Sequence, residues 1–471
     1  MEKSNLVSVL QVLDKKELRE LRKWVQSPAH NQREDVLQLF GYLTAGSHLF
    51  SEKLLAKERV FEAVFPGKTF NDAEMRQVMH LLFKVVEDFL MYRELLKDGA
   101  RTQAMLARVY RERQLPKLFL KAMEDGKKIQ QQQPFRNHHY YENEYLLQFE
   151  QYSYLSTQGR NVPLNLQAVS DANDVAFLVN KFQLSCIMHS HQAVYKTSYN
   201  IGLLEACLRH VEQNEEALLT PAVAMYYYSY RAINSPDDIS FFIKMKEQIT
   251  AHGELFPHQE MRVIYLLAIN YCIGRINAGD ASFYRETFEL FKDGMEKQLF
   301  LEGGVLSRFT FSNAIIAGLN LREFDWVENF IQEYSRFLDD KHRDNYVGFY
   351  MARLYYEQKN YGQAMKRIVQ SDYDDLLMNL AAKTMLLKMY YELDEFDVLD
   401  SLIESMGAYI QRKKVMGYHR TIYKNLILYT KKLARINPGN TEQVKKLKAE
   451  IEKAEPLMER KWLLEQVEKL I

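Results

Sequence analysis

Glycine and proline are scarce in this chain of 471 residues, which contains only 19 Gly and 10 Pro. These two residue types form most tight turns, so their scarcity argues against an all-β fold and favours long helices with short connections. The chain is also too long for one compact core. Its length fits two or three domains or one extended solenoid.

Cysteine is rarer still, and charge of one sign is not in excess. The three cysteines form no Cys-x-x-Cys pair, and an odd, sparse count is typical of free buried thiols in a reducing cytoplasm. Lys plus Arg and Asp plus Glu both number 62, so no global field recruits nucleic acid or an anionic membrane. No run of about 18 apolar residues exists, and charges interrupt the first apolar stretch, so we expect neither a transmembrane helix nor a secretory leader.

Linear motifs of catalysis are absent as well. The chain has no G-x-x-x-x-G-K-[ST], G-x-G-x-x-G, G-x-S-x-G or H-E-x-x-H pattern, which are the signatures of nucleotide binding, acyl transfer and zinc hydrolysis. Gly303-Gly304 is expected to be a turn between helices. We therefore expect a protein that is not an enzyme, uses no cofactor and has no small-molecule substrate. An enzyme whose site has no linear motif stays an alternative.

A repeated turn is the most informative feature that is present. Three similar tripeptides lie at 323–325, 360–362 and 395–397. Each contains an acidic or amide residue followed by an aromatic, and successive aromatics are 37 and 35 residues apart. Each tripeptide lies between two helix-forming stretches, and a period of about 20–50 residues indicates a helical repeat array. We expect the aromatics Phe324, Tyr361 and Phe396 to wedge between helices.

The unit around Tyr361 resembles a tetratricopeptide repeat. The residues that match that family's helix-crossing and turn positions are Ala352, Tyr355, Tyr361, Ala364 and Ile368. In the next unit Tyr390 and Phe396 match, whereas Leu387 and Leu399 replace small residues. The chain also resembles uncharacterised bacterial helical-repeat proteins, a resemblance that supplies no activity.

This resemblance implies an all-α, right-handed α-solenoid of antiparallel helix pairs, with degenerate repeats. We expect a helical N-terminal region at 1–160 and the solenoid at 161–471, clearest at 304–410. Among the other helices, apolar spacing predicts one at Lys15–Gln26 that Pro28 ends, and another that Asn71 caps. A last helix is expected near 456–470. No stretch alternates with a period of two, so essentially no sheet is expected.

A peptide-binding groove is the function that this resemblance implies. In tetratricopeptide arrays the first helix of each pair lines the concave face. Arg353 and Lys388 occupy one equivalent position there, and Tyr356 and Tyr391 occupy another. Two cations beside two aromatics are suited to an acidic segment or a C-terminal carboxylate. We therefore expect a non-catalytic cytoplasmic scaffold that binds a protein or peptide on a concave surface and does not act at a membrane.

A basic segment at 405–441 is the basis of a nucleic-acid alternative. It contains no acidic residue, while tyrosines alternate with cations that could bind phosphates. The cations are Arg412, Lys413, Lys414, Arg420, Lys424, Lys431, Lys432 and Arg435. The preceding 372–404 contains nine acidic residues against Lys383 and Lys388. Pairing between these two segments is the simpler interpretation, a protein partner is a second, and nucleic acid is unlikely.

Two Cys/His pairs are weak metal candidates. Cys186 with His189, and Cys207 with His210, each lie three residues apart and share a helix face. A zinc site needs three or four ligands, which the two pairs supply only if their helices pack together. Buried cysteines beside surface histidines are the simpler interpretation, so no metal is expected.

Overall fold

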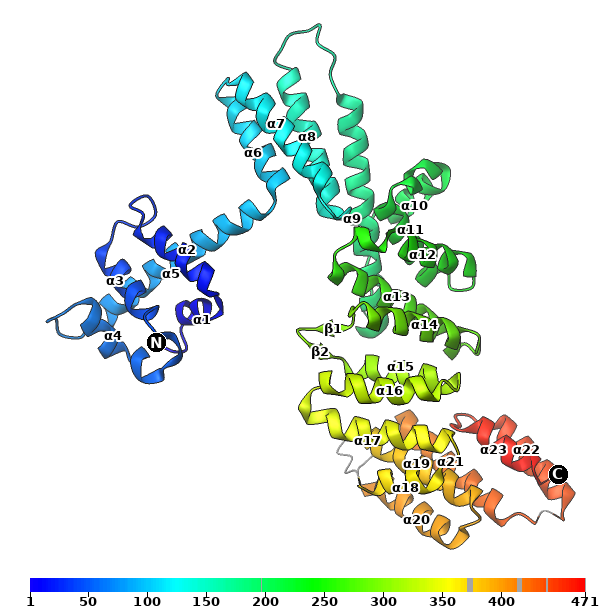
Figure 1. Cartoon of the computed structure of the whole chain (residues 1–471). Helices are drawn as coiled ribbons and strands as arrows, with labels where there is room; N and C mark the ends of the chain where they lie inside the picture. Colours follow the sequence, from blue (N-terminus) through cyan, green and yellow to red (C-terminus); the bar gives the residue numbers. More distant parts are fainter. Residues whose placement is uncertain (196, 371–375, 413–416, 438, 471) are drawn as a thin grey trace. The chain divides into compact units, whose positions relative to one another are not determined.

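The computed structural model describes residues 1–195, 197–370, 376–412, 417–437 and 439–470 (Figure 1). The described residues are almost entirely helical, from α1 (Asn5–Val12) to α23 (Arg460–Glu468). The all-α prediction is therefore confirmed for this part of the chain.

Two compact units make up the chain. The first comprises Met1–Leu184 and Gly202–Val223, and the second comprises Ser185–Ile201 and Ala224–Ile471. Two helices, α9 (Leu166–Tyr195) and α11 (Pro221–Asn234), pass from one unit into the other. The division expected after residue 160 stays a prediction.

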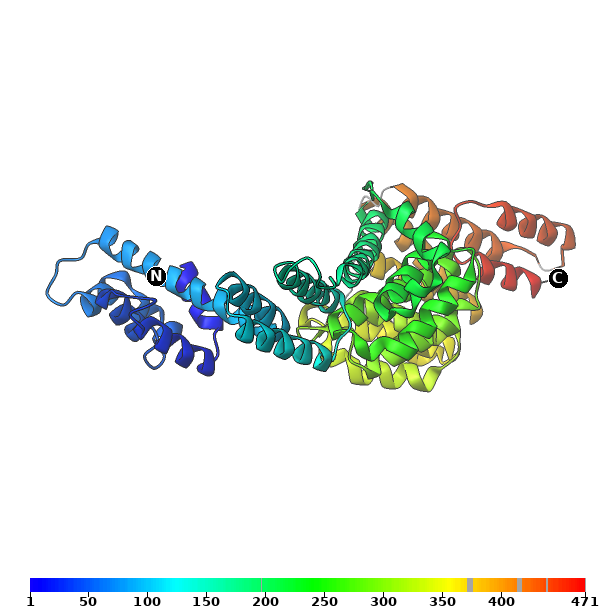
Figure 2. The same ribbon diagram turned by 90° about the horizontal axis from the view of Figure 1, so that it is seen from above.

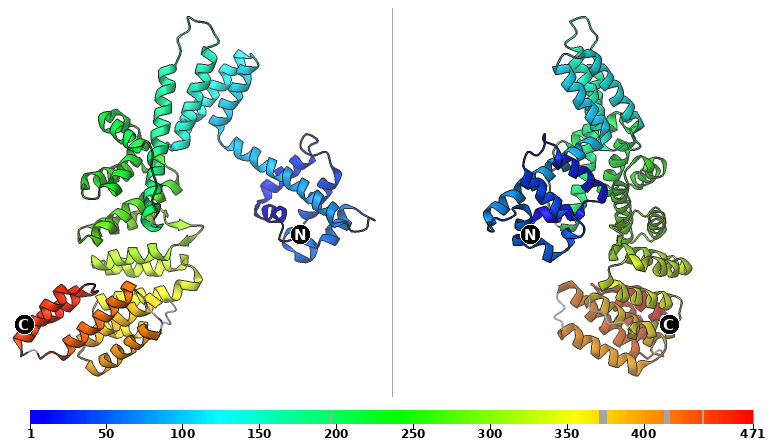
Figure 3. Two further views of the ribbon diagram at one scale, coloured as in Figure 1. Left: turned by 180° about the vertical axis from the view of Figure 1, so that it is seen from behind. Right: turned by 60° about the vertical axis from the view of Figure 1, so that its left-hand side comes forward.

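The first unit begins with short helices gathered around the first half of α5 (Figure 3). Their apolar faces form one core that includes Leu10, Leu39, Phe61 and Leu82. The elements of this unit are α1, α2 (Lys15–Gln26), α3 (Glu34–Leu43), η1 (His48–Phe50), η2 (Glu52–Leu55), α4 (Lys57–Val64), α5 (Asp72–Lys97), α6 (Gly99–Glu112), α7 (Pro116–Gln132), α8 (His138–Leu155), the first part of α9, α10 (Leu204–Gln213) and η3 (Glu215–Leu219).

Local signals set several of these helix ends. Asp14 and Glu17 form a reciprocal capping box at the start of α2, and the helix ends at Gln26 just before Ser27-Pro28, as predicted. The Asn71 side chain accepts hydrogen bonds from the backbone N–H groups of Ala73 and Glu74, which confirms the predicted cap of α5. Caps of this kind satisfy N–H groups that have no partner within the helix.

The second unit is a series of helices in which each packs on its neighbours in sequence, and the alternate helices α15, α17 and α19 also contact one another. Figure 2 shows α22 and α23 beside α21 at its C-terminal end. Its elements are the rest of α9 and α11, α12 (Ile239–His252), η4 (Gly253–Leu255), α13 (His258–Asn277), α14 (Phe283–Glu296), β1 (Leu301–Glu302), β2 (Val305–Leu306), α15 (Arg308–Asn320), α16 (Phe324–Tyr334), η5 (Ser335–Phe337), α17 (Asp340–Glu357), α18 (Tyr361–Gln370), α19 (Leu376–Glu392), α20 (Phe396–Arg412), α21 (Gly417–Arg435), α22 (Thr441–Lys453) and α23.

The three repeated turns share one backbone geometry. Arg322, Lys359 and Asp394 each end a helix with positive φ, at 59°, 61° and 59°. The next residue then donates its backbone N–H to a carbonyl five residues earlier, at 3.0, 2.8 and 2.9 Å. This is the Schellman arrangement that satisfies the last carbonyls of a helix. The same arrangement also ends α6 at Gln114 and α14 at Gln298, and the three repeated turns share it at corresponding places of the sequence repeat.

The expected aromatic wedge does not hold for Phe396, which is 41% exposed. Its ring forms a T-shaped pair with the Tyr391 ring, with centroids 6.0 Å apart. At the first of the three turns the tight crossing is made instead by Gly318, where an added Cβ would lie 2.6 Å from Val327 Cγ2. Helix α15 therefore approaches α16 through a glycine that the resemblance did not single out.

A hairpin with two residues in each strand is the one sheet among the described residues, which agrees with the expectation of essentially no sheet. Strands β1 and β2 pair antiparallel, with Leu301 opposite Leu306. Gly303 and Gly304 join them with φ of 58° and 81°, which confirms the predicted turn. Positive φ at both central residues gives the twist that a tight hairpin needs.

Candidate functional site

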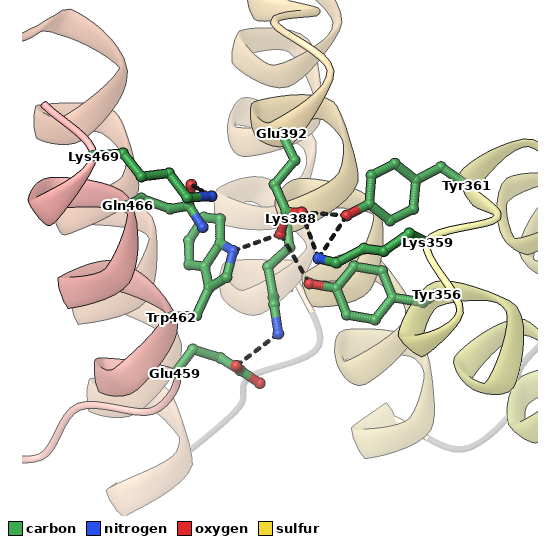
Figure 4. Close-up of polar contacts among 9 residues, drawn as sticks. All are labelled: Tyr356, Lys359, Tyr361, Lys388, Glu392, Glu459, Trp462, Gln466 and Lys469. Atoms are coloured by element: carbon green, nitrogen blue, oxygen red, sulfur yellow. Dashed lines mark hydrogen bonds and ion pairs between the residues drawn. The ribbon is translucent and has the colours of Figure 1, made fainter. Parts of the chain in front are cut away.

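The carboxylate of Glu392, the last residue of α19, is the centre of a cluster in the second unit (Figure 4). It accepts hydrogen bonds from Tyr356 Oη at 3.0 Å and from the indole Nε1 of Trp462 at 2.8 Å. Lys359 Nζ lies 3.0 Å from its other oxygen, to which Tyr361 Oη also donates. The Glu392 side chain is 9% exposed, so its charge is largely shielded from solvent and has four donors.

Neighbouring turns and helices position these donors. Tyr356 is near the end of α17, Lys359 is the left-handed residue that ends it, and Tyr361 begins α18. The Tyr356 and Tyr361 rings stack with centroids 5.6 Å apart. Trp462 comes from α23, 70 residues beyond Glu392. One carboxylate at the end of α19 thus contacts residues of α17, α18 and α23.

The ionisation of this cluster follows from its hydrogen bonds. Burial would raise the pKa of Glu392, but the bonds from Tyr361, Lys359 and Trp462 outweigh burial and lower it to about 2. Burial and the adjacent Glu392 charge raise the pKa of Tyr356. At neutral pH the carboxylate is ionised and the phenol is protonated. This arrangement holds helices together and does not favour proton transfer.

The predicted groove residues lie against the same C-terminal helix. Lys388 Nζ is 2.9 Å from the carboxylate of Glu459, and it lies 4.9 Å from the Tyr356 ring centroid. The Tyr391 ring meets Trp462 edge-on, with centroids 5.6 Å apart. Three of the four predicted residues therefore come together, and the chain's own helix α23 lies on them.

Arg353, the fourth predicted residue, is half-buried on α17. Its charge acts on Tyr350 and opposes the rise that burial causes in the pKa of that tyrosine. Lys388, Tyr356 and Tyr391 lie near one another, and their binding of a peptide stays a prediction. Sequence reasoning missed Glu392, Glu459 and Trp462. The one available signal was the tryptophan in the predicted last helix.

The Cys/His pairs fall in different units. In the second unit the Cys186 thiol is buried and donates to the Tyr226 carbonyl at 3.6 Å, and burial raises its pKa. His189 meets the Tyr230 ring edge-on, and burial lowers its pKa. In the first unit Cys207 is buried and His210 is exposed. Within the described ranges, no group of three or more His, Cys, Asp or Glu side chains is placed to hold a metal ion.

The basic segment shows a mixture of paired and exposed cations. Lys413 and Lys414 lie outside the described residues, and Arg420 and Lys424 are exposed on α21. Arg412 lies over the Tyr409 ring at 5.9 Å. Arg435 lies 3.5 Å from Asp400, which is one contact of the kind expected between the basic and acidic segments.

The other basic residues surround a groove between α21 and α22. Lys431, Lys432 and Arg435 line it from α21, and Lys432 pairs with Glu450 of α22 at 2.5 Å. The groove encloses about 490 Å³.

A second groove in this unit is apolar and lies between α12 and α14. Phe242 and Phe283 form its floor, with ring centroids 5.8 Å apart. Ile239 and Ile243, one helical turn apart on α12, line it while 39% and 51% exposed. Lys246 and Glu286 pair across it. Its volume is about 780 Å³.

Comparison with models of protein families, with curated proteins and with solved structures finds no match to this chain. A search of the described helices finds none that is long and apolar enough to span a membrane.

Proposed function

We propose that this chain is a non-catalytic scaffold that binds a protein partner. The architecture we propose is a right-handed α-solenoid of antiparallel, tetratricopeptide-like helix pairs. Two observations support it: the repeated left-handed turns at Arg322, Lys359 and Asp394, and the contacts among the alternate helices α15, α17 and α19. In such arrays each pair buries its apolar faces against its neighbours, and the row of pairs offers a long binding surface.

The apolar groove between α12 and α14 is the observation that carries the binding proposal. Exposed apolar patches of this kind mark interaction sites. Its two isoleucines are spaced by one helical turn above a phenylalanine floor, which suits the apolar face of an amphipathic helix. The neutralised Lys246–Glu286 pair leaves little net charge to select against such a helix.

The surface around Lys388 supports the same function in a different way. There the repeats already hold a helix, α23, through an aromatic anchor and an ion pair. Lys388 contacts Glu459 and Tyr391 contacts Trp462, three residues further along the chain. In the proposed scaffold this face is closed by the chain itself, and partners bind elsewhere.

The three buried free cysteines support a reducing compartment, so we place the scaffold in the cytoplasm. This assignment is part of the proposal and is tested by locating the tagged full chain in cells.

Partner capture from cells tests the function. The tagged full chain is crosslinked in its source cells, and co-purified proteins are quantified by mass spectrometry. We expect Ile243→Glu to lower recovery of at least one abundant partner about tenfold, equal to about 1.4 kcal/mol, whereas Ile243→Leu retains it. Val398→Glu on α20 is the matched control, because Val398 is also exposed, at 43%, and does not line the groove. Equal recovery with Ile243→Glu and Val398→Glu would remove the proposal.

A further inference from the structure

We propose that the groove between α21 and α22 binds an acidic, amphipathic segment of a partner protein. This inference rests on the proposed scaffold function and adds the chemical class of one partner segment. The groove is formed in part by the residues of the basic segment that contacts with α20 and α23 leave open.

The groove is built from two matching helical ridges. Leu428, Lys431, Lys432 and Arg435 follow one face of α21 at i, i+3, i+4 and i+7, and Gln443, Lys446, Leu447 and Glu450 follow α22 with the same spacing. Each ridge is about 10 Å long, which equals two turns of a helix. Ridges of this kind leave a channel that accepts the side chains of a third helix.

The floor of this groove is apolar. Leu428 is 47% exposed, although it lies among charged residues on α21. Ile436 is half-buried, and Leu447 is buried at the base. Isolated exposed leucines are common on proteins, but here three aliphatic side chains share one hollow. Burying such side chains is the main source of affinity for an amphipathic partner.

The rim is positively charged. Four cations line the groove against one carboxylate, that of Glu450, which Lys432 already neutralises at 2.5 Å. Lys446 is exposed on α22, and Lys431 is half-buried on α21. Carboxylates on a partner would therefore meet an excess of cations at the edges of an aliphatic floor. Charge complementarity of this kind steers association and fixes orientation.

A protein segment fits this groove better than nucleic acid does. Base stacking needs open aromatic faces. Tyr423 is buried, and Tyr429 lies beneath Lys432 at 5.5 Å. The groove floor offers aliphatic groups in place of aromatic rings.

The test measures binding of a synthetic probe to the full chain by fluorescence anisotropy. The probe is a labelled helical peptide about four turns long, with leucines on one face and glutamates elsewhere. We expect Lys446→Glu and Leu428→Asp to weaken binding at least tenfold. Lys445→Glu is the matched control, because this exposed neighbour makes the same charge change and does not line the groove. It should change binding less than twofold.

Three results would overturn the inference. One is equal weakening by Lys445→Glu and Lys446→Glu, which would show diffuse charge attraction only. Another is equal affinity for a scrambled peptide of the same composition, which would show that the apolar floor is not used. The third is tighter binding of a labelled single-stranded oligothymidine that Lys446→Glu also weakens, which would assign the groove to nucleic acid. Lys446→Gln is a second variant that removes the charge without reversing it, and it should weaken the peptide at least threefold.

The two proposals fail separately. Loss of the peptide signal alone, with an Ile243-dependent partner still recovered from cells, removes only the α21–α22 inference. The absence of any partner that depends on Ile243 removes the scaffold function, whatever the peptide does.

Discussion

The indole N–H of Trp462 donates to the carboxylate of Glu392 at 2.8 Å, across 70 residues of sequence. This bond links the last described helix to the end of α19. The bond is charge-assisted, and its acceptor carboxylate is largely shielded from solvent, which makes it stronger than a typical surface hydrogen bond.

Replacing Trp462 by Phe keeps an aromatic ring and removes the donor. We expect the free energy of unfolding to fall by about 1–3 kcal/mol, since bonds to charged groups contribute in this range. Urea denaturation followed by circular dichroism measures it. Trp24→Phe is the matched control, because Trp24 Nε1 is buried without a hydrogen-bond partner among the described residues. A loss at Trp462 no larger than that at Trp24 would contradict the role given to this bond.

Acid should weaken the second unit through Glu392. Its pKa is lowered from 4.5 to about 2, so its ionised form stabilises the folded state. That contribution is complete above pH 4.5 and is lost as pH falls from 4.5 to 2. We expect Glu392→Gln to be less stable than the native chain at pH 7, by on the order of 2 kcal/mol, with the difference shrinking toward pH 2. Thermal melts of both chains between pH 7 and pH 2 measure this difference in stability. A difference that stays constant with pH would refute the prediction.

Arg322→Gly should stabilise the chain. Arg322 has a φ of 59°, and a left-handed conformation costs a non-glycine residue about 1–2 kcal/mol. Glycine removes this strain but loses more entropy on folding, so we expect a net gain of about 0.5–1 kcal/mol. Lys359→Gly tests whether relief of this backbone strain explains the gain in stability. It relieves the same strain but loses the contact with Glu392, so it should gain less or lose stability. Equal gains at both positions would show that the Lys359–Glu392 contact adds nothing.

Gly318→Ala should destabilise the crossing of α15 and α16. The new methyl would lie 2.6 Å from Val327 Cγ2 and 3.4 Å from Phe288, and overpacking of this kind costs about 1–3 kcal/mol. Gly407→Ala inside α20 is the control, because nothing lies within 4 Å of its added Cβ. There alanine should stabilise the helix by about 0.5–1 kcal/mol. We expect the melting temperature to fall for Gly318→Ala and to rise for Gly407→Ala. A stabilised Gly318→Ala variant would contradict the packing of α15 against α16.

Features decided by neighbouring residues could be predicted from the sequence. The bounds Lys15–Gln26 follow from the Asp14 cap and Pro28, and the turns that end α15, α17 and α19 recur because their patterns are local. Ala352 and Ala364, which the family resemblance assigns to helix-crossing positions, are both fully buried. Each of these sequence patterns lies within a few residues of the structural feature that it predicts.

Features that depend on distant contacts could not be predicted in this way. Phe396 follows the same kind of turn as Tyr361, yet it is exposed, and no local pattern separates the two. The sequence predicts an open groove at Lys388 because the helix that covers it, α23, begins 72 residues later in the sequence. Gly318 lies in an unremarkable helix segment and becomes special only when Val327 packs against it.

The separation of Glu392 from Trp462 also sets an order of events during synthesis. At about 5–20 residues per second, Glu392 is made about 4–14 s before the tryptophan that completes its shell of donors. During this interval Tyr356, Lys388 and Tyr391 have no α23 to cover them, and a nascent chain presents this face to chaperones and to other nascent chains. Helix α23 can therefore cover this surface only after the residues that it contacts have been made.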